Sequence, residues 1–510
     1  MPGEICNPIL PGFYPDPSIC RVGDDFYMVT SSFSYFPGVP VFHSRDLQNW
    51  EQLGHVLERP EQAPLDSRYI SGGIYAPTIR YHDGLFYMIT TNVSGVGDFV
   101  CTAERPEGPW SDIHVIHGAP GIDPSLFWDE DGTCYMCGTG DWKDGYPHIW
   151  GAVLDTDTWT LGEKHELWRG ALHDCWAPEA PHIYRKDGRY YLLIAEGGTE
   201  HYHAVTIARS DSPLGKYRGY EGNPILTHRH LGWDYPICNT GHADLVQLQD
   251  GSWYMVLLAS RLYGGYHKNL GRETFLVPVD WRGEWPVVNP GKGCVEFTCP
   301  APALPPHPFE ARDDNDLRSP VWNTLGTPTN RPVRIEGNEL YLRCVAPTFI
   351  PQPGEPEDWK RQAIGFYGRR QQHMCFAASA WATLPEAEGV SCGMAVVQNG
   401  YAALRVELTR DQSGVTARAL KSWQAPGGTR CEALLGEAAV GETVRLEIRA
   451  EGQCYTLLAD DRPLGSADGG FLGSESAGGF VGAYVGMFAS GNGTDSPVEA
   501  RFTRFRYQGC

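Results

Sequence analysis

The 510-residue sequence predicts an all-β protein with two domains, a five-bladed β-propeller followed by a β-sandwich. Three observations support this prediction. A hairpin pattern recurs five times in residues 1–290, a proline-rich segment follows it, and short runs of alternating polar and apolar residues fill the remainder. No segment carries the periodicity of a strong helix.

Each copy of the repeat has the same order of residue types. An apolar run leads into a short polar turn, usually Asp-Gly, and an aromatic residue, a tyrosine and further apolar residues follow. This order is typical of two antiparallel strands joined by a tight turn. Five such units, about 50 to 60 residues apart, predict propeller blades whose first strands line a central channel. The copies occupy residues 16–28, 76–88, 123–135, 179–191 and 242–254.

The residues that open the five inner strands carry most of the chemistry. They are Asp16, a position near Tyr75, Asp123, Glu179 and His242. Because the first strands of all blades start at the same end of a propeller, we expect these side chains to meet on one axis. Three carboxyl groups and a histidine converging in one cleft indicate an active site.

Glu179 has an unusual local sequence. It lies between Pro178 and Pro181, close to Trp176, so its backbone is stiff and extended. A carboxyl group held among apolar groups is desolvated, which raises its pKa and produces an acid that keeps its proton near neutral pH. The alternative is that Glu179 has a structural role, as a surface glutamate at the start of a strand. The carboxyl groups at the matching positions of other repeats favour a functional role.

The second half of the chain has a different pattern. We assign residues 1–290 to the propeller, 291–309 to a proline-rich linker and 310–510 to the sandwich. Alternation with a period of two, as in residues 339–343 and 402–408, is typical of half-buried antiparallel strands. About 200 residues of this kind predict a β-sandwich.

Composition excludes some classes of partner. The net charge is -21 and no basic tract stands out, which argues against nucleic acid and anionic membranes as partners. The sequence begins without the features of a signal peptide, and its 15 cysteines lack the spacing of a disulfide framework. We therefore expect reduced cysteines and a cytoplasmic protein. Cys134 and Cys137 form a C-x-x-C by spacing only, because they lie in a predicted strand without a second pair.

An ordered set of segments resembles glycoside hydrolase family 43, specifically its two-domain β-xylosidases. The resemblance covers nearly the whole chain and implies a five-bladed propeller followed by a lectin-like (concanavalin A-like) β-sandwich. It also implies an inverting exo-glycosidase that releases xylose from the non-reducing end of β-1,4-xylo-oligosaccharides. The segments that carry it are residues 7–18, 121–127, 176–181, 223–229, 271–276 and 369–373.

By motif, the resemblance implies that Asp16 is the general base and Glu179 the general acid. Asp123 corresponds to a third carboxylate, which orients the acid and raises its pKa. Like-charge repulsion would make Glu179 harder to ionise, in agreement with that role. An inverting enzyme needs its base and acid ~6.5–9.5 Å apart, so that a water molecule fits between the base and the sugar.

Four further residues match positions around the sugar. The resemblance implies that Arg272 contacts the terminal sugar and that Phe33 forms an aromatic wall of the pocket. Tyr75 stands where many relatives have tryptophan, which leaves the sugar preference open. His242 matches a histidine near the channel centre that in relatives binds a water or a calcium ion. No cofactor is required, and a Ca²⁺ ion held near the propeller centre by His242 is an open alternative.

The sequence leaves other functions open. An α-L-arabinofuranosidase, or a bifunctional enzyme, would use the same mechanism on a xylo-oligosaccharide or arabinosyl substrate. A retaining fructosidase also combines a propeller with a sandwich, but its Asn-Asp-Pro-Asn-Gly and Glu-Cys signatures are not found. A non-catalytic sugar-binding propeller should lack one of the carboxyl groups, and none is missing. The oligomeric state stays open, and a homo-oligomer is one alternative.

Overall fold

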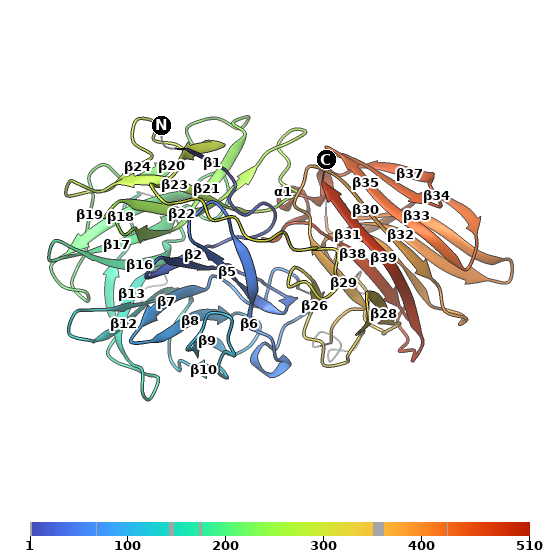
Figure 1. The fold of residues 1–510 in the computed structure, drawn as a ribbon, viewed down its shortest axis with the longest axis horizontal. Helices are drawn as coiled ribbons and strands as arrows, with labels where there is room; N and C mark the ends of the chain where they lie inside the picture. The colour runs from blue at the N-terminus through green and yellow to red at the C-terminus, as the bar shows by residue number, and fades with distance from the viewer. Residues whose placement is uncertain are drawn as a thin grey trace.

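The computed structural model describes residues 3–67, 69–141, 147–172, 176–349, 362–425 and 427–509. It is an all-β protein, with the propeller on the left of Figure 1 and the sandwich on the right. The helical segments in these ranges are short: η1 (Pro60–Gln62), η3 (Gly470–Leu472) and α1 (Ser474–Ala477). No helix in the described ranges is long and apolar enough to cross a membrane.

Five antiparallel sheets follow one another along the chain, and the first two strands of each are one of the predicted hairpins. The five-bladed propeller is therefore confirmed. Blades 1 and 2 contain β2 (Ser18–Val22), β3 (Asp25–Val29), β5 (Gly38–Ser44) and β6 (Glu51–Leu57), then β7 (Thr78–His82), β8 (Leu85–Asn92), β9 (Gly97–Ala103) and β10 (His114–Val115). Blade 3 contains β11 (Ile122–Trp128), β12 (Cys134–Asp141), β13 (Pro147–Asp155), β14 (Thr160–Leu161) and β15 (His165–Trp168).

Blade 4 contains β16 (Glu179–Lys186), β17 (Arg189–Glu196), β18 (Ala204–Ser210), β19 (Arg218–Gly219) and β20 (Leu226–Thr227). Blade 5 contains β21 (Ile237–Gln247), β22 (Trp253–Arg261), β23 (Glu273–Asp280) and β24 (Val287–Val288).

The Asp-Gly turns explain the hairpins. Asp83 and Gly84 have φ values of 46° and 87°, and Asp187 and Gly188 have values of 51° and 74°. Two successive residues with positive φ match the type I′ turn, whose twist agrees with that of the two strands it joins. Asp and Gly tolerate this backbone better than most residues, which is why these dipeptides predicted the turns.

The ring closes where the start of the chain returns to the last blade. Apolar side chains of blade 1 and blade 5 share one core cluster, which includes Met28 and Val256. The N-terminal strand β1 (Glu4–Cys6) pairs with β25 (Thr298–Pro300), and Asn7 exchanges hydrogen bonds with the backbone of Leu276. Part of the predicted linker 291–309 therefore forms a strand on the propeller.

A buried ion pair links the inner strands. Asp244 of blade 5 is fully buried and lies 2.8 Å from Arg80 of blade 2. The same carboxylate accepts hydrogen bonds from Ser18 of blade 1 and Tyr184 of blade 4. Arg80 also contacts the ring of His182, at 2.9 Å. Removing one partner of a buried pair costs ~3–5 kcal/mol, so this network holds four blades in a fixed arrangement around the axis.

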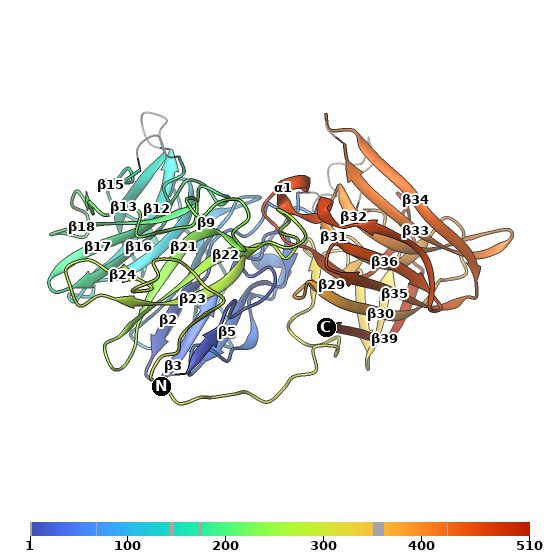
Figure 2. The same cartoon turned by 90° about the horizontal axis from the view of Figure 1, so that it is seen from above.

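The second domain is a sandwich of two antiparallel sheets over one large apolar core. Figure 2 shows it beside the propeller, with the connecting segment running along the outside of both. The eight-stranded sheet has the order β34 (Arg430–Val440), β33 (Gly414–Gln424), β32 (Ala402–Asp411), β31 (Ser391–Asn399), β38 (Tyr484–Ser490), β29 (Phe366–Arg370), β26 (Asn323–Leu325) and β4 (Tyr35–Phe36). The seven-stranded sheet has the order β27 (Val333–Glu336), β28 (Glu339–Arg343), β39 (Glu499–Gly509), β30 (Cys375–Thr383), β35 (Thr443–Glu451), β36 (Cys454–Ala459) and β37 (Arg462–Asp468).

The two domains share structure rather than only touching. Strand β4, from the propeller half of the chain, is the last strand of the eight-stranded sandwich sheet. Tyr35 of β4 stacks on Tyr484 of β38 with ring centres 3.6 Å apart. Arg370 is almost fully buried, donates a 2.6 Å hydrogen bond to the carbonyl oxygen of Phe13, and lies over the ring of Tyr14. The sandwich is therefore fixed against the propeller.

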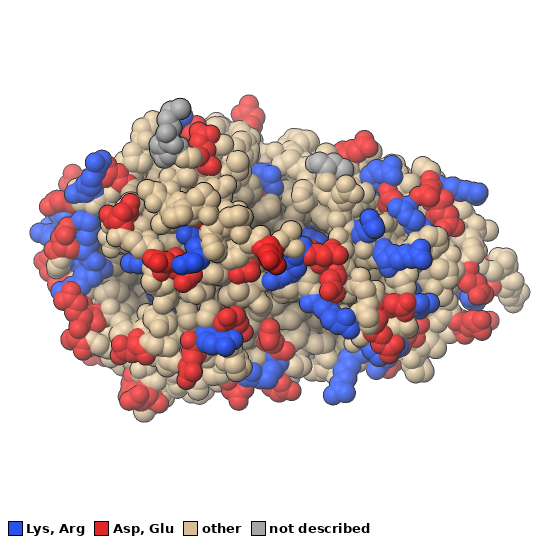
Figure 3. Space-filling view, in the orientation of Figure 1, with Lys and Arg blue, Asp and Glu red and all other residues tan. Residues whose placement is uncertain are grey.

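The charged side chains form no single-sign patch on the face shown in Figure 3, and no disulfide joins the described cysteines. On the face drawn in Figure 3, acidic and basic side chains are interspersed over both domains. The described cysteines are free thiols, and both Cys134 and Cys137 are buried in β12.

Candidate active site

The backbone bends where the inner strands begin. The pairing of β11 with β12 shifts register between Ile122 and Ser125, and β16 shifts against β17 after Glu179. Such bulges re-aim side chains and are common beside active sites. Asp16, Asp123 and His242 have φ values of 56°, 56° and 48°. Left-handed backbone at non-glycine residues costs ~1–3 kcal/mol and clusters at functional sites, so these strained positions mark the site.

The structure brings the predicted residues into one pocket of about 170 Å³. Every site residue predicted from the sequence lines it. Pockets that hold drug-sized ligands have ~300–1,000 Å³, so this one has room for a single small ring. The lining consists of Asp16, Phe33, Tyr75, Ala76, Ile122, Asp123, Trp176, Ala177, Glu179, Gly198, Thr199, His242, Arg272 and Phe480.

Asp16 is held in its ionised form. Its side chain is 5% exposed, and Arg272 donates a 2.8 Å hydrogen bond to one carboxylate oxygen. Ser31 donates to the other oxygen at 2.5 Å, and His242 lies 3.6 Å away. Burial alone would raise the pKa of Asp16, but the charges of Arg272 and His242 and the bond from Ser31 outweigh burial, so the pKa lies below its usual value. Asp16 can therefore accept a proton.

Blade 3 fixes the position of Glu179. Hydroxyl groups of Thr139 and Ser125 donate to the carbonyl oxygens of Pro178 and Pro181, the two prolines around Glu179. Burial, and then the negative charge of Asp16, raise the pKa of Glu179 to about 7. Glu179 therefore keeps its proton in weakly acidic solution, as its surroundings in the sequence indicate.

Asp123 is linked to Glu179 both by charge and through the backbone. Its carboxylate accepts a 3.2 Å hydrogen bond from the backbone N–H of Ala180, next to Glu179. Burial and then the charge of Glu179 raise the pKa of Asp123 well above its usual value. Asp123 and Glu179 therefore share a like-charge interaction, which makes it harder to ionise both carboxyl groups together.

Arg272, Phe33 and Tyr75 form a wall of the pocket. The guanidinium of Arg272 lies 5.6 Å from the ring centre of Phe33, and the rings of Phe33 and Tyr75 are 5.3 Å apart. Arg272 also donates to the hydroxyl of Thr199 at 3.0 Å. Its buried Nε has no hydrogen-bond partner among the described atoms. The three side chains thus present a cation beside two aromatic rings to the pocket.

His242 lies beside Asp16, at the position where the resemblance leaves a metal ion open. Burial lowers its pKa, with the charge of Asp16 acting in the opposite direction. Within the described ranges, no three His, Cys, Asp or Glu side chains form a group that could hold a metal. Calcium takes six to eight oxygen ligands, and the nearest charged groups here are one carboxylate and the cation of Arg272. The described side chains therefore supply only part of a calcium coordination shell, and water or backbone oxygens would have to complete it.

Sequence reasoning missed Phe480, which comes from the sandwich. Its carbonyl oxygen accepts a 3.2 Å hydrogen bond from Arg272, and its backbone N–H donates to Ser71. Its ring stands edge-on to Tyr75, with centres 6.5 Å apart. Phe480 lies more than 200 residues from the other lining residues, in a glycine-rich loop without a motif, so no local signal could have placed it here. The second domain thus completes the pocket.

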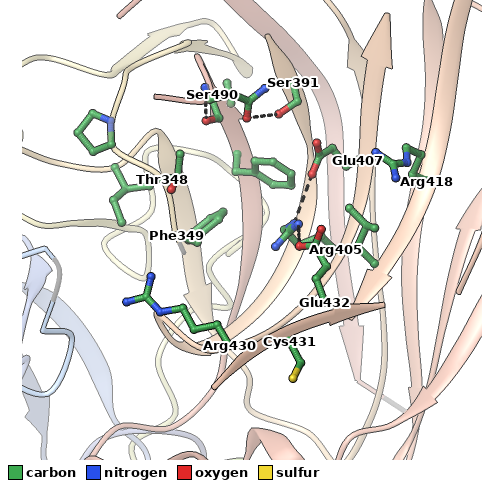
Figure 4. Close-up of a pocket in the computed structure, with 16 residues that line it drawn as sticks. Thr348, Phe349, Ser391, Arg405, Glu407, Arg418, Arg430, Cys431, Glu432 and Ser490 are labelled. Carbon is green, nitrogen blue, oxygen red and sulfur yellow. Dashed lines mark hydrogen bonds and ion pairs between the residues drawn. The ribbon is translucent and has the colours of Figure 1, made fainter. Parts of the chain in front are cut away.

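A larger pocket of about 530 Å³ lies in the sandwich (Figure 4). Arg405 pairs there with Glu432 at 2.7 Å and with Glu407 at 3.4 Å. Although burial acts against it, Arg405 lowers the pKa of Glu432, which stays ionised. This pocket therefore lacks the combination of one proton donor and one proton acceptor found in the propeller, and we place the chemistry in the propeller.

The opposed pKa shifts predict a pH profile. Activity should fall as the pH rises through about 7, because Glu179 then loses its proton. It should fall on the acid side only when Asp16 becomes protonated, below the usual range of an aspartate. Because Asp123→Asn removes a negative charge that interacts with Glu179, we expect it to lower kcat and to move the alkaline limb to lower pH. Initial rates between pH 3 and 9 measure both limbs, and a limb that stays in place in the variant would show that Asp123 positions groups without tuning the acid.

Comparison with known proteins gives matches over both domains. Residues 5–286 match the family described as glycosyl hydrolases family 43, and residues 313–508 match the beta xylosidase C-terminal concanavalin A-like domain. The chain is 42% identical to a xylosidase/arabinosidase of Butyrivibrio fibrisolvens, over 98% of both chains. It is 38% identical to the non-reducing end alpha-L-arabinofuranosidase BoGH43B of Bacteroides ovatus, over 98% of this chain and 94% of the relative.

Solved structures agree with these matches. The crystal structure of a xylan beta-1,4-xylosidase from Bacillus halodurans superposes with a TM-score of 0.88 at 32% sequence identity. The superposition covers 99% of this chain and all of that one.

Proposed function

Because the chain belongs to glycosyl hydrolase family 43 and is a glycoside hydrolase, we propose that it releases xylose from the non-reducing end of β-1,4-xylo-oligosaccharides with inversion. One observation carries this proposal. Two carboxyl groups of a single small pocket have opposed pKa shifts, downward for Asp16 and upward to about 7 for Glu179. Pairs of titratable groups that their surroundings push apart in this way supply the base and the acid of a reaction.

The proposed reaction is a single displacement. Asp16 takes a proton from a water molecule, and the water oxygen attacks the anomeric carbon of the terminal sugar. Glu179 gives its proton to the glycosidic oxygen while the bond between that oxygen and the anomeric carbon breaks. The products are a free pentose with inverted anomeric configuration and a shortened oligosaccharide. Asp16 and Glu179 exchange a proton with solvent before the next turnover.

The shape of the pocket supports cleavage at a chain end. Its volume of about 170 Å³ suits one sugar ring, and Phe480 from the sandwich stands at its edge. A chain that continued in both directions would collide with this wall. Arg272 lines the pocket beside Asp16, where its guanidinium is placed to orient the terminal sugar.

A second candidate is the removal of α-L-arabinofuranosyl groups by the same residues. The name of the Bacteroides ovatus relative supports it, and the name of the Butyrivibrio relative combines both activities. Tyr75 in the aromatic wall, where many relatives have tryptophan, is the feature of this pocket that bears on the choice.

Two assays test the proposal. Rates on nitrophenyl β-xyloside and nitrophenyl α-L-arabinofuranoside should rank the two sugars, with the xyloside hydrolysed faster. Early products from xylotetraose should be xylose and xylotriose. Xylobiose as the first product would show internal cleavage and contradict the chain-end proposal, and a faster arabinofuranoside would favour the second candidate.

A further inference from the structure

The three most exposed large apolar side chains among the described residues belong to one region. Trp176 is 68% exposed, and Tyr202 and Trp233 are each 58% exposed. Isolated exposed apolar residues are ordinary, whereas a contiguous group marks a binding surface. We call Trp176, His201, Tyr202, Trp233 and Tyr266 the rim cluster.

Ring contacts make the outer part of the rim cluster continuous. His201 stacks on Trp233 with ring centres 3.7 Å apart and planes inclined by 9°. Tyr202 meets His201 edge-on at 5.4 Å, and Tyr266 meets Trp233 edge-on at 5.2 Å. These contacts hold the Trp233 ring in place, and its exposed surface is available to a ligand.

The rim cluster is continuous with the catalytic pocket. Trp176 both lines the pocket and belongs to the cluster, and its carbonyl oxygen accepts a hydrogen bond from the N–H of Gly197. A Cβ at Gly198 would lie 2.5 Å from the Trp176 ring, so this glycine is what allows the close approach. Thr199, bonded to Arg272 inside the pocket, is two residues from His201.

The loop that carries these residues is anchored. Glu200 forms an ion pair with the buried Lys268 and accepts hydrogen bonds from Asn239 and from Ser474 of the sandwich. Lys268 also lies over the ring of Tyr266, at 5.1 Å. Aromatic groups that are already fixed bind a ligand without the cost of ordering them first.

We propose that the rim cluster binds the leaving-group sugars of β-linked pentose chains longer than a disaccharide. This inference rests on the proposed function, because the pocket holds one ring and the remaining sugars must lie outside it. Glu179 protonates the leaving oxygen and is three residues from Trp176, so the leaving group departs past Trp176 toward the cluster. Trp and Tyr combine a flat apolar face with a polar edge, as a sugar ring does.

Charge favours a neutral ligand over an anionic one. The nearby cation of Lys268 is already paired with Glu200. Burial, with the cations of Lys268 and Arg229 nearby, lowers the pKa of His201, which favours the neutral form of its ring. A surface of neutral rings suits an uncharged xylan chain.

Trp233→Ala is the direct test, because Trp233 does not line the pocket. We expect unchanged kcat/KM on nitrophenyl β-xyloside and a loss of about three- to tenfold on xylotetraose, carried mainly by KM. Xylobiose should be affected less than xylotetraose. Tyr202→Ala, which removes an exposed ring with one edge contact, is the second variant in case Trp233→Ala is unstable.

Tyr81→Ala is the matched control. Tyr81 is 39% exposed but lies in β7 near the turn end of its hairpin, away from the end where the inner strands begin. Tyr81→Ala should leave the activity on every substrate unchanged. In Trp233→Ala, equal losses of activity on the aryl substrate and on xylotetraose, or no loss on xylotetraose, would overturn the inference.

Two further outcomes separate the alternatives. A wild-type protein inactive on every aryl pentoside would remove the proposed function itself, and this inference with it. Sedimentation that changes from dimer to monomer in Trp233→Ala would show that the cluster is an interface between copies of the chain, and would overturn sugar binding there.

Discussion

Asp16→Ala is expected to lose about 10⁴-fold in kcat/KM on every substrate, at the upper end of what a general base contributes. Both a nitrophenyl xyloside and a xylo-oligosaccharide need an activated water molecule, so a better leaving group cannot compensate. Within the pocket, the depressed pKa of Asp16 identifies it as the carboxyl group ready to accept a proton. Steady-state rates on nitrophenyl β-xyloside and xylobiose measure both losses.

Folding must be controlled in this experiment, because Asp16 is buried against Arg272. Asp16→Asn keeps the shape of the side chain and should be as inactive as Asp16→Ala, with a melting temperature closer to the wild type. A variant that stays folded and keeps more than about a tenth of the activity would show that another group is the base.

Glu179→Ala is expected to separate two kinds of substrate. Hydrolysis of xylobiose should fall by about 10³- to 10⁴-fold, because a sugar alkoxide is a poor leaving group without a proton. A nitrophenolate leaves without protonation, so the aryl xyloside should lose far less. The same rate measurements on paired substrates show this difference, and the variant's activity on the aryl substrate should no longer fall as the pH rises through about 7.

Equal losses on both substrates would remove Glu179 from the acid role. Thr139→Ala is a useful companion variant, because it removes the bond to the Pro178 carbonyl oxygen while leaving the carboxyl group. Because this variant loosens the position of the acid, it should lower the rate on xylobiose by a modest factor and the rate on the aryl xyloside by less.

Local sequence predicted the propeller because its signals are short-range. The Asp83-Gly84 and Asp187-Gly188 turns and the apolar strands around them specify hairpins without help from distant residues. The repeat phase then placed Asp16, Asp123, Glu179 and His242 at equivalent positions, and all four line one pocket.

Long-range features could not be predicted in the same way. Strand β4 is two residues long and joins a sheet made almost entirely by the other half of the chain. Phe480 reaches the pocket only because the sandwich is fixed against the propeller by contacts such as those of Arg370. Bulges in β11 and β16 add a residue to a strand, and a period-two pattern does not show where.

The role of Asp123 shows the same limit for electrostatics. Like charges predict that one carboxyl group of a close pair has a raised pKa, but not which one. Burial also raises the pKa of a carboxyl group, and burial is a property of the folded chain. Here burial raises the pKa of both Asp123 and Glu179, and Asp123 also accepts a hydrogen bond from the backbone N–H of Ala180, beside the acid.

The central claim is a single displacement in which Asp16 activates water and Glu179 protonates the leaving group. The most direct measurement is proton NMR of the first product formed from a β-xyloside, recorded before mutarotation. One displacement inverts the anomeric carbon, so α-xylose should be formed first. β-Xylose as the first product, or a glycosyl ester trapped on Asp16 or Glu179, would contradict this account and indicate a retaining mechanism with a covalent intermediate.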